Sequence, residues 1–497
     1  MKRLSFCCLL MAFVCLHLSA EQTFPQPFRQ ADYRGASFSY VLLDAETGEL
    51  CAKHQPEQIL SSASIVKLLT TATALEVLGP DYAAETRLYY QGKIQDGVLH
   101  GDVWLLPLGD PTLGSALFHE HPFAFLDEWT AALQKAGISL VKGSVRLLDA
   151  WADEQAVSPY WLWEDLGNYY AAGVYSAAIY ENALDLYLSS GGVGETVSLQ
   201  KVYPSFPSFH FDVKAFAADN NKDSAYVYGV PYQYQRQVFG SIPAHRNAFR
   251  VRADNPDPNG SLRWLWQEHL QKSGISISVA LAFDEGVMRV SDFDAFVSEG
   301  KLRLFHTHRS LSLREMIRQC NVRSNNLLAE YLARHAAWRL GADLPLSATE
   351  SLRAMLSFWQ DKGLDVSDCF LKDACGLAPQ TAFSASFLAA VLQYMSQESA
   401  YADVFLSSIP LAGKEGTLRS LAVDVPGSLR LKSGSMSGVR CYAGYYTLPA
   451  LSAEPAGSAA APPASRYILV LMINRANVPT ARLLSDIRQW LKASLPQ

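Results

Sequence analysis

Two reactive side chains, a hydroxyl and an amine, are three residues apart in Ser64-Ile65-Val66-Lys67. Apolar residues recur at helical spacing from Ile65 to Leu78, so we expect Ser64 and Lys67 to share one face near the start of an amphipathic helix. A desolvated, neutral lysine can take the serine proton, and a helix N-terminus favours the negative charge that develops. The pattern predicts a serine nucleophile that forms an acyl enzyme.

The spacing alone is a weak signal, because three other Ser-x-x-Lys matches occur. They are Ser139 to Lys142, Ser198 to Lys201 and Ser298 to Lys301. These three lie in short, strand-like or turn-like surroundings. Ser64 instead follows a β-hairpin predicted over residues 38–52 and opens a long helix. The setting therefore singles out Ser64.

The segment Ser324-Asn325-Asn326 places a hydroxyl and a carboxamide two residues apart at the turn that begins a second predicted helix. Such a pair can relay a proton and hold a substrate carbonyl. Helix capping is the alternative, because Ser and Asn are expected at a helix start. Taken alone, the segment favours capping.

The segment Lys432-Ser433-Gly434-Ser435 lies on a predicted strand. A cation, two hydroxyls and a glycine that lets backbone approach can bind an acyl substrate as an added strand and clamp its carboxylate. Another Lys-Ser-Gly triplet ends at Gly274, but there it follows a predicted helix in which the glycine is the expected C-cap. Context favours the later triplet.

The three segments occur in one order: Ser-x-x-Lys at a helix start, Ser-x-Asn at a second helix start, and Lys-Ser-Gly on a late strand. This set is the signature of the penicillin-recognising serine enzymes. The chain resembles the class C low-molecular-mass penicillin-binding proteins, the D-Ala-D-Ala carboxypeptidase/endopeptidase family. Other stretches share the resemblance: LGDPTL at 108–113, WLWEDLGNYY at 161–170, DACGL at 373–377 and IPLAGKEGTL at 409–418.

The resemblance implies an α/β (α+β) fold, in which a penicillin-recognising serine transpeptidase-like domain has an antiparallel sheet with helices on both faces. Two inserted, mainly β domains interrupt it between Ser64 and Ser324. The expected layout is a signal peptide at 1–20, the catalytic domain at 21–84 and 293–497, inserted domain II at 85–186 and 263–292, and inserted domain III at 187–262.

The resemblance also implies catalytic roles. Ser64 would be the nucleophile and Lys67 its general base. Ser324 would pass the proton to the leaving amine, Asn326 would hold the substrate amide, and Lys432 would tune the site electrostatically. The implied reaction is serine D-Ala-D-Ala carboxypeptidase/DD-endopeptidase cleavage of peptidoglycan peptides, with β-lactam antibiotics as inhibitors.

Substrate binding is implied for five further residues. Ser433 and Ser435 would bind the terminal carboxylate beside Gly434, while Asp165 and Tyr170 would receive the amine end of a diaminopimelate side chain. Close relatives carry an Arg and a Gln near this pocket, where this chain has Pro379 and Ser437. Those two departures put the usual contacts to diaminopimelate in doubt.

Composition bounds the class of protein. The chain has 497 residues, 49% of them hydrophobic and 18% charged, with a formal net charge of −6. This length predicts two or three domains. Because no cluster of Lys and Arg stands out, nucleic acid is not an expected partner. A homodimer stays open.

No cofactor or metal is expected. The pairs His119/His121 and His306/His308 each place two imidazoles on one face of an extended segment. Neither pair has a third ligand at useful spacing along the chain.

The N-terminus predicts export. Lys2 and Arg3 precede a mostly apolar run from Leu4 to Leu16, and small residues lead to Ala20. A spanning helix needs about 20 apolar residues, so we expect a secretory signal cleaved near Ala20 and a soluble periplasmic protein. Five cysteines follow, namely Cys51, Cys320, Cys369, Cys375 and Cys441. The odd number favours isolated buried thiols, with one bridge between Cys369 and Cys375 as the alternative.

Two other functions compete. One is a β-lactamase or esterase built on the same machinery, and the long gap between Ser64 and Ser324 argues against it. The other is a binding protein that no longer turns over its ligand. A complete set of Ser64, Lys67, Ser324, Asn326 and Lys432 argues against that, because a binding module does not need all five.

Overall fold

The computed structural model describes residues 26–449 and 465–496. The predicted signal peptide at 1–20 lies outside the described residues. In the part of the chain that is described, none of the helices combines the length and the apolar character that crossing a bilayer requires.

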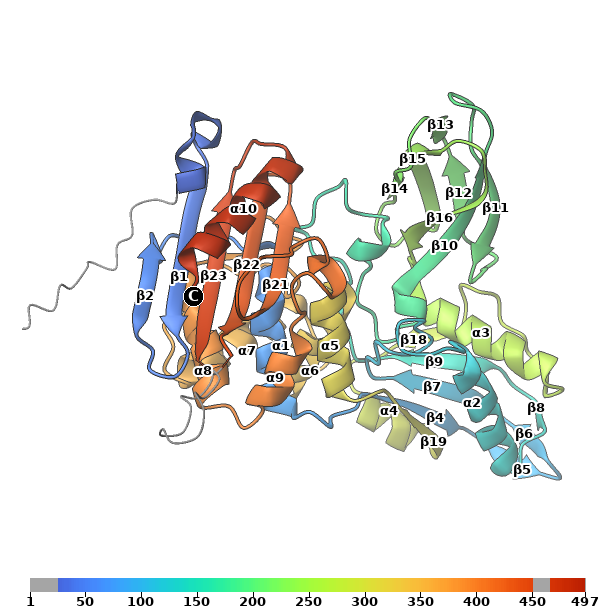
Figure 1. Ribbon diagram of the computed structural model, residues 1–497. Helices are drawn as coiled ribbons and strands as arrows, with labels where there is room; N and C mark the ends of the chain where they lie inside the picture. The colour runs from blue at the N-terminus through green and yellow to red at the C-terminus, as the bar shows by residue number, and fades with distance from the viewer. Residues whose placement is uncertain (1–25, 450–464, 497) are drawn as a thin grey trace, which may run out of the picture.

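A five-stranded antiparallel sheet with the strand order β2-β1-β23-β22-β21 forms the centre of the first domain (Figure 1). Its strands are β1 (Ser37–Asp44), β2 (Leu50–His54), β21 (Ser428–Met436), β22 (Val439–Thr447) and β23 (Arg466–Asn474). The first two come from the N-terminal part of the chain and the other three from the C-terminal part. The sheet is therefore complete only when the two parts meet across the insertions.

Helices cover both faces of this sheet (Figure 1). On one face lies α10 (Thr480–Ser494), whose Trp490 packs edge-on against Tyr40 with ring centroids 5.0 Å apart. On the other face, α8 (Ala385–Gln397) contacts β1 and β23. Further helices of this domain are α1 (Val66–Leu78), α5 (Leu313–Arg323), α6 (Asn326–Arg339), α7 (Ala348–Asp361) and α9 (Ala402–Ser408).

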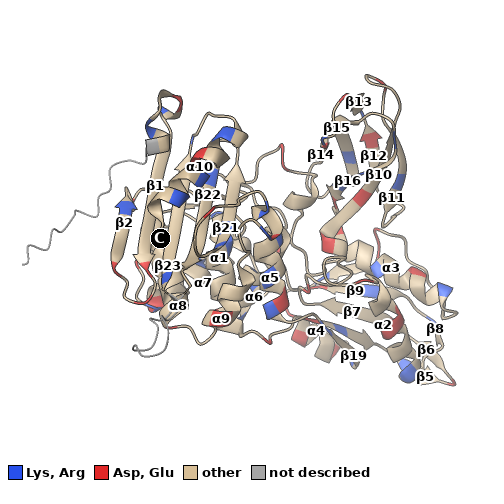
Figure 2. Ribbon diagram, in the orientation of Figure 1, with Lys and Arg blue, Asp and Glu red and all other residues tan. Residues whose placement is uncertain are grey.

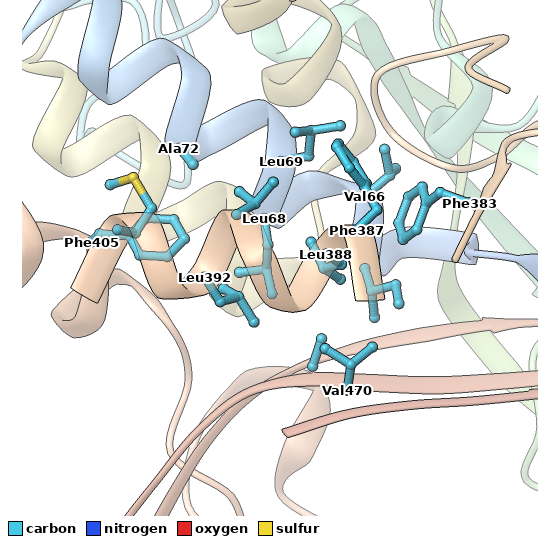
Figure 3. Packing of buried hydrophobic residues seen from close by; sticks show 14 of the residues in the cluster. Val66, Leu68, Leu69, Ala72, Phe383, Phe387, Leu388, Leu392, Phe405 and Val470 are labelled. Carbon is cyan, nitrogen blue, oxygen red and sulfur yellow. The ribbon is translucent and has the colours of Figure 1, made fainter. Parts of the chain in front are cut away.

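The helix that follows Ser64 lies at the centre of the largest apolar core. Figure 3 shows side chains of α1 packed against those of α8, with Val470 of β23 below them. The labelled contacts include Val66, Leu68, Leu69 and Ala72 of α1, and Phe387, Leu388 and Leu392 of α8. Burying each leucine stabilises the fold by roughly 1.5–3 kcal/mol. This core therefore holds the start of α1 in place.

The expectation of an amphipathic helix here is wrong. Every residue from Val66 to Leu75 in α1 is buried, because α1 lies between α8 and the helices α5, α6 and α7. The buried hydroxyls of Thr71 and Thr73 donate to carbonyls one turn earlier, at 2.7 and 2.8 Å. A helix covered on all sides needs no polar face.

Two inserted units follow α1 in the chain (Figure 1). The first contains sheets of order β18-β9-β7-β4-β19 and β17-β8-β6-β5. Its elements are β4 (Glu85–Tyr90), β5 (Lys93–Gln95), β6 (Val98–His100), β7 (Val103–Pro107), α2 (Ala124–Lys135), β8 (Leu140–Val141), β9 (Val145–Asp149), α3 (Pro258–Lys272), β17 (Ser276–Ile277), β18 (Val287–Arg289), α4 (Phe293–Glu299) and β19 (Arg303–Arg309).

The second inserted unit is built from two small sheets. One contains β10 (Ala183–Ser190), β11 (Ser198–Tyr203) and β16 (Arg246–Asp254). The other contains β12 (His210–Val213), β13 (Phe216–Ala218), β14 (Ser224–Tyr228) and β15 (Gln235–Pro243). An antiparallel sheet with helices on both faces, interrupted by two mainly β units, is thus confirmed.

The boundary expected at residue 292 falls before β19. Because β19 pairs with β4 from Arg303 to Arg309, we propose that the first inserted unit extends to Arg309. The chain then returns to the first domain at α5.

Candidate active site

A cleft of about 980 Å³ brings together residues from distant parts of the chain. Among its lining residues are seven that the sequence singled out: Ser64, Asp165, Tyr170, Ser324, Asn326, Ser433 and Ser435. The side chains of Lys67 and Lys432 lie behind this lining and are fully buried. The three ordered motifs therefore meet at one place.

The other three Ser-x-x-Lys pairs lie in the inserted units. They are found beside β8, within β11 and at the end of α4. The early Lys-Ser-Gly triplet ends α3, and its Gly274 has a φ of +81° as a helix C-terminal glycine should. The local context in the sequence thus distinguished these four additional motif matches from the residues that meet at the cleft.

Ser64 lies on a short 3₁₀ turn (Ala63–Ile65) that runs directly into α1. Its hydroxyl oxygen is 2.9 Å from Lys67 Nζ, one helical turn further on. The amine also lies 2.7 Å from Asn326 Oδ1 and 2.5 Å from the carbonyl oxygen of Cys375. Three acceptors therefore surround the Lys67 amine, and one of them is the predicted nucleophile.

Strand β21 approaches the Ser64 turn very closely. A Cβ atom at Gly434 would be 2.8 Å from the Ser62 carbonyl oxygen and 3.0 Å from the Ser64 nitrogen. Such contacts are shorter than van der Waals distances, so a side chain at this position would push the strand away. The glycine lets the backbone of β21 lie against the turn that carries Ser64.

The alternative of simple capping at Ser324-Asn325-Asn326 is resolved by geometry. The N-cap of α6 is Asn325, whose Oδ1 accepts the Leu328 N–H at 2.9 Å. Ser324 ends α5 in the left-handed conformation, with φ 56° and ψ 39°. The side chains of Ser324 and Asn326 are therefore not used as N-caps, and both line the cleft.

The second lysine lies on β21 and reaches Ser324. Lys432 Nζ donates to Ser324 Oγ at 2.9 Å and to the Ser433 carbonyl at 2.6 Å. Burial of this amine is the main cause that lowers its pKa well below its ordinary value. A buried amine with few compensating charges favours its neutral form.

The remaining predicted residues also line the cleft. Ser433 Oγ is 2.7 Å from Thr417 Oγ1, which lies in the connection between α9 and β21. The Tyr170 hydroxyl donates a hydrogen bond to the Asp165 carboxylate. Burial raises the pKa of Asp165, and the hydrogen bond from Tyr170 opposes that rise. Pro379 and Ser437, the two departures, also line the cleft.

Sequence reasoning missed contacts made by the main chain. The carbonyl of Cys375 accepts from Lys67, and the carbonyl of Tyr170 accepts from Asn326 Nδ2 at 2.7 Å. Asp373 holds the first of these segments, because its carboxylate accepts the N–H groups of Gly376 and Ala378 at 3.0 and 2.7 Å. The DACGL stretch was the available signal, but the residue type does not reveal a main-chain acceptor.

The charged side chains are distributed over the whole of the described structure, and the cysteines form no disulfide within it (Figure 2). Lys and Arg are interspersed with Asp and Glu over the described elements (Figure 2). All five described cysteines are free thiols. Cys320, Cys375 and Cys441 are buried as expected, whereas Cys51 is exposed and Cys369 is half-buried. The alternative bridge between Cys369 and Cys375 is not formed.

Known proteins are similar to this chain. The family model of the D-Ala-D-Ala carboxypeptidase 3 (S13) family matches residues 27–462. The D-alanyl-D-alanine carboxypeptidase of Actinomadura sp. (strain R39) is 26% identical over 448 residues, covering 84% of this chain and 76% of the relative. The D-alanyl-D-alanine carboxypeptidase DacB of Haemophilus influenzae is 22% identical over 419 residues, covering 83% of each chain.

A solved structure shares the fold. The crystal structure of penicillin binding protein 4 (dacB) from Haemophilus influenzae matches with a TM-score of 0.74 and 22% identity, over 92% of this chain and 96% of that one. The expected penicillin-recognising fold is therefore confirmed. Because the family model spans most of the chain, the protein belongs to the D-Ala-D-Ala carboxypeptidase 3 (S13) family and is a serine D-Ala-D-Ala carboxypeptidase/endopeptidase.

Proposed function

We propose that Ser64 attacks the carbonyl of the penultimate D-Ala in peptidoglycan stem peptides and forms an acyl enzyme. The observation that carries this assignment is the 2.9 Å distance between Ser64 Oγ and Lys67 Nζ at the cleft. Attack forms the Oγ–C bond, collapse breaks the C–N bond, and D-Ala leaves with a proton on its nitrogen. Water then hydrolyses the ester and restores Ser64.

Lys67 acts as the general base in this proposal. A neutral amine has two N–H groups and one lone pair. The Cys375 carbonyl and the Asn326 amide oxygen can only accept, so they take the two N–H groups. The lone pair then faces the Ser64 hydroxyl, which can act as a donor. The surroundings of Lys67 thus orient it to receive the Ser64 proton.

Ser324 and Lys432 serve the leaving group. Lys432 donates to Ser324 Oγ, so the hydroxyl hydrogen of Ser324 is free to point at the departing amine of D-Ala. Passing that proton to the amine lets it leave in neutral form, and the proton that Lys67 took from Ser64 replaces it on Ser324. Asn326 holds the substrate amide from the same side.

Strand β21 binds the oxygen of the scissile carbonyl and the terminal carboxylate of the substrate. The backbone N–H groups of Ser64 and Ser435 form the oxyanion hole, and the close packing at Gly434 supports their convergence. The hydroxyls of Ser433 and Ser435 receive the terminal carboxylate. Thr417, in contact with the Ser433 hydroxyl, orients that group.

We further propose that β-lactam antibiotics acylate Ser64. The Haemophilus influenzae penicillin binding protein 4 has also been solved in complex with a β-lactam, and that structure matches this one with a TM-score of 0.69. A periplasmic location after cleavage near Ala20 belongs to the same proposal. A homodimer stays a prediction that light scattering on the purified protein would test.

Intact-mass spectrometry with benzylpenicillin tests the assignment. One adduct per chain is expected, and peptide mapping should place it on Ser64. Ser64→Ala should lose the adduct, whereas Ser198→Ala, which removes the serine of an exposed Ser-x-x-Lys pair, should keep it. A persistent adduct in Ser64→Ala contradicts the proposal. Rapid loss of the wild-type adduct with hydrolysed antibiotic would instead support the β-lactamase alternative.

A further inference from the structure

A second group of chemically reactive side chains lies far from the cleft in the fold, where α2 packs on β19. Glu128 Oε1 is 2.9 Å from His306 Nε2, and Glu128 Oε2 is 3.3 Å from His308 Nδ1. One ligand atom from each residue lies within 4.8 Å of the others. We propose that Glu128, His306 and His308 form a binding site for a zinc ion.

The sequence predicted no metal because the third ligand is remote. Glu128 precedes His306 by 178 residues, and only the packing of α2 on the edge strand β19 brings them together. His306 and His308 alternate along β19, so both imidazoles project from one face of the sheet. Two imidazoles and a carboxylate are a common ligand set for zinc, leaving the fourth position to water.

The distances fit such an ion. Zinc bonds of about 2.0–2.1 Å in a tetrahedron place neighbouring ligand atoms roughly 3.3 Å apart. The separations of 2.9 Å between Glu128 Oε1 and His306 Nε2 and of 3.3 Å between Glu128 Oε2 and His308 Nδ1 are close to that value. The side chain of Glu128 is 49% exposed, so an ion can enter from solvent.

A buried carboxylate supplies independent support. Asp110 is 1% exposed, and its Oδ1 accepts from the N–H and hydroxyl of Thr112 at 2.8 and 2.7 Å. Its Oδ2 is buried and accepts no hydrogen bond from a described residue, yet it lies 3.9 Å from His308 Nε2. With zinc on Nδ1, the Nε2–H of His308 would point toward this oxygen. Carboxylates in this position orient metal-binding histidines and strengthen binding.

Another cluster among the described residues does not have this character. Glu330, Asp373 and Cys375 also bring ligand atoms together, but all three are fully buried. The Glu330 oxygens accept from the Ala374 N–H and from Arg334. The Glu330 carboxylate is thus occupied by protein donors, whereas Oδ2 of Asp110 accepts no hydrogen bond from a described residue.

A zinc ion here would join α2 to β19. Strand β19 is separated from α5 by only three residues, 310–312, and Ser324 directly follows α5. Because the ion would bind the folded arrangement and not the extended chain, it should raise the melting temperature. The site lies away from the cleft, so acylation of Ser64 should not require it.

Zinc titration calorimetry on the tag-free, chelator-treated protein tests the proposal. We expect one zinc per chain, with the affinity about tenfold or more weaker in Glu128→Gln and His308→Ala, and weakened in Asp110→Asn. His210→Ala, which removes an exposed histidine on β12, should bind as the wild type does. Binding unchanged by Glu128→Gln and His308→Ala, or no saturable binding by the wild type, overturns the proposal.

Two measurements guard against variants that misfold. Cobalt replacing zinc in the wild type should give the visible absorption of a four-coordinate site, and zinc should displace it. Anomalous scattering at the zinc edge from a soaked crystal should place the ion between Glu128 and His306. An ion found only elsewhere overturns the proposal. Each variant is used only if its metal-free circular dichroism matches that of the wild type.

Discussion

Gly434 lies so close to the Ser64 turn that a Cβ atom at this position would be 3.0 Å from the Ser64 backbone nitrogen and 2.8 Å from the Ser62 carbonyl oxygen. Both groups belong to main chain held by the core around α1, so neither can move away cheaply. The lack of a side chain at Gly434 therefore sets the distance between β21 and the N–H of Ser64.

Gly434→Ala should slow acylation by benzylpenicillin about 10²–10³-fold, because the displaced strand separates the two N–H donors of the proposed oxyanion hole. Stopped-flow acylation rates would measure this. Gly363→Ala is the control, since Gly363 lies in an exposed turn with φ +85° and should lose stability while keeping its acylation rate. Equal rates in Gly434→Ala and the wild type would contradict the role of this contact.

Ser324→Gly should be more stable than Ser324→Ala by about 1 kcal/mol, since a left-handed backbone costs a residue with a side chain roughly that much. Both variants should lose turnover of a D-Ala-D-Ala peptide, because both lack the hydroxyl. Urea unfolding and a D-alanine release assay would measure the two effects. If Ser324→Gly retained full turnover, Ser324 would have no part in proton transfer.

His335 should make the protein less stable as the pH falls below neutrality. Burial lowers the pKa of this imidazole from 6.5 to about 4, although the Gly109 carbonyl favours its charged form. The unfolded chain therefore binds more protons than the folded one between these two values. The neutral form contributes its full stability above pH 6.5, and this contribution is lost as the pH falls toward 4.

Between pH 7 and pH 5, this residue should account for about 2 kcal/mol of lost unfolding free energy. His335→Gln should remove that difference, although it will be less stable at pH 7 because the Gly109 carbonyl and the Tyr82 hydroxyl lose their partner. Urea unfolding of both proteins at the two pH values measures the slope. Parallel losses in both proteins would exclude His335 as the cause.

Asp165→Asn should weaken the turnover of peptides that carry a free side-chain amine more than that of small esters without one. The carboxylate lines the same cleft as Ser433 and would supply a negative charge to the proposed amine pocket. Comparing kcat/KM for the two substrate types isolates this interaction, because changes at the reaction centre would affect both. Equal losses would remove Asp165 from side-chain recognition.

The pattern of residues along the chain led to the proposed chemistry and to most of the architecture. Ser64, Lys67, Ser324, Asn326 and Lys432 were chosen as candidates because each motif has a distinct local setting, and helix starts and strands leave periodic signals in sequence. The strand that carries Lys432 was likewise predictable, and the split domain with its two inserted units was expected from the resemblance to the family. Local context was enough to set aside the other Ser-x-x-Lys and Lys-Ser-Gly matches, because turns and helix caps are short-range features.

Only the tertiary structure decided which groups touch. The burial of α1 on all sides depends on helices supplied by distant segments, so its composition looked amphipathic when read alone. The carbonyls of Cys375 and Tyr170 act as acceptors regardless of residue type, and such main-chain contacts leave no signature. Glu128 meets His306 because α2 packs on β19. Contacts between remote segments follow from the packing of the whole chain, which spacing along the sequence does not encode.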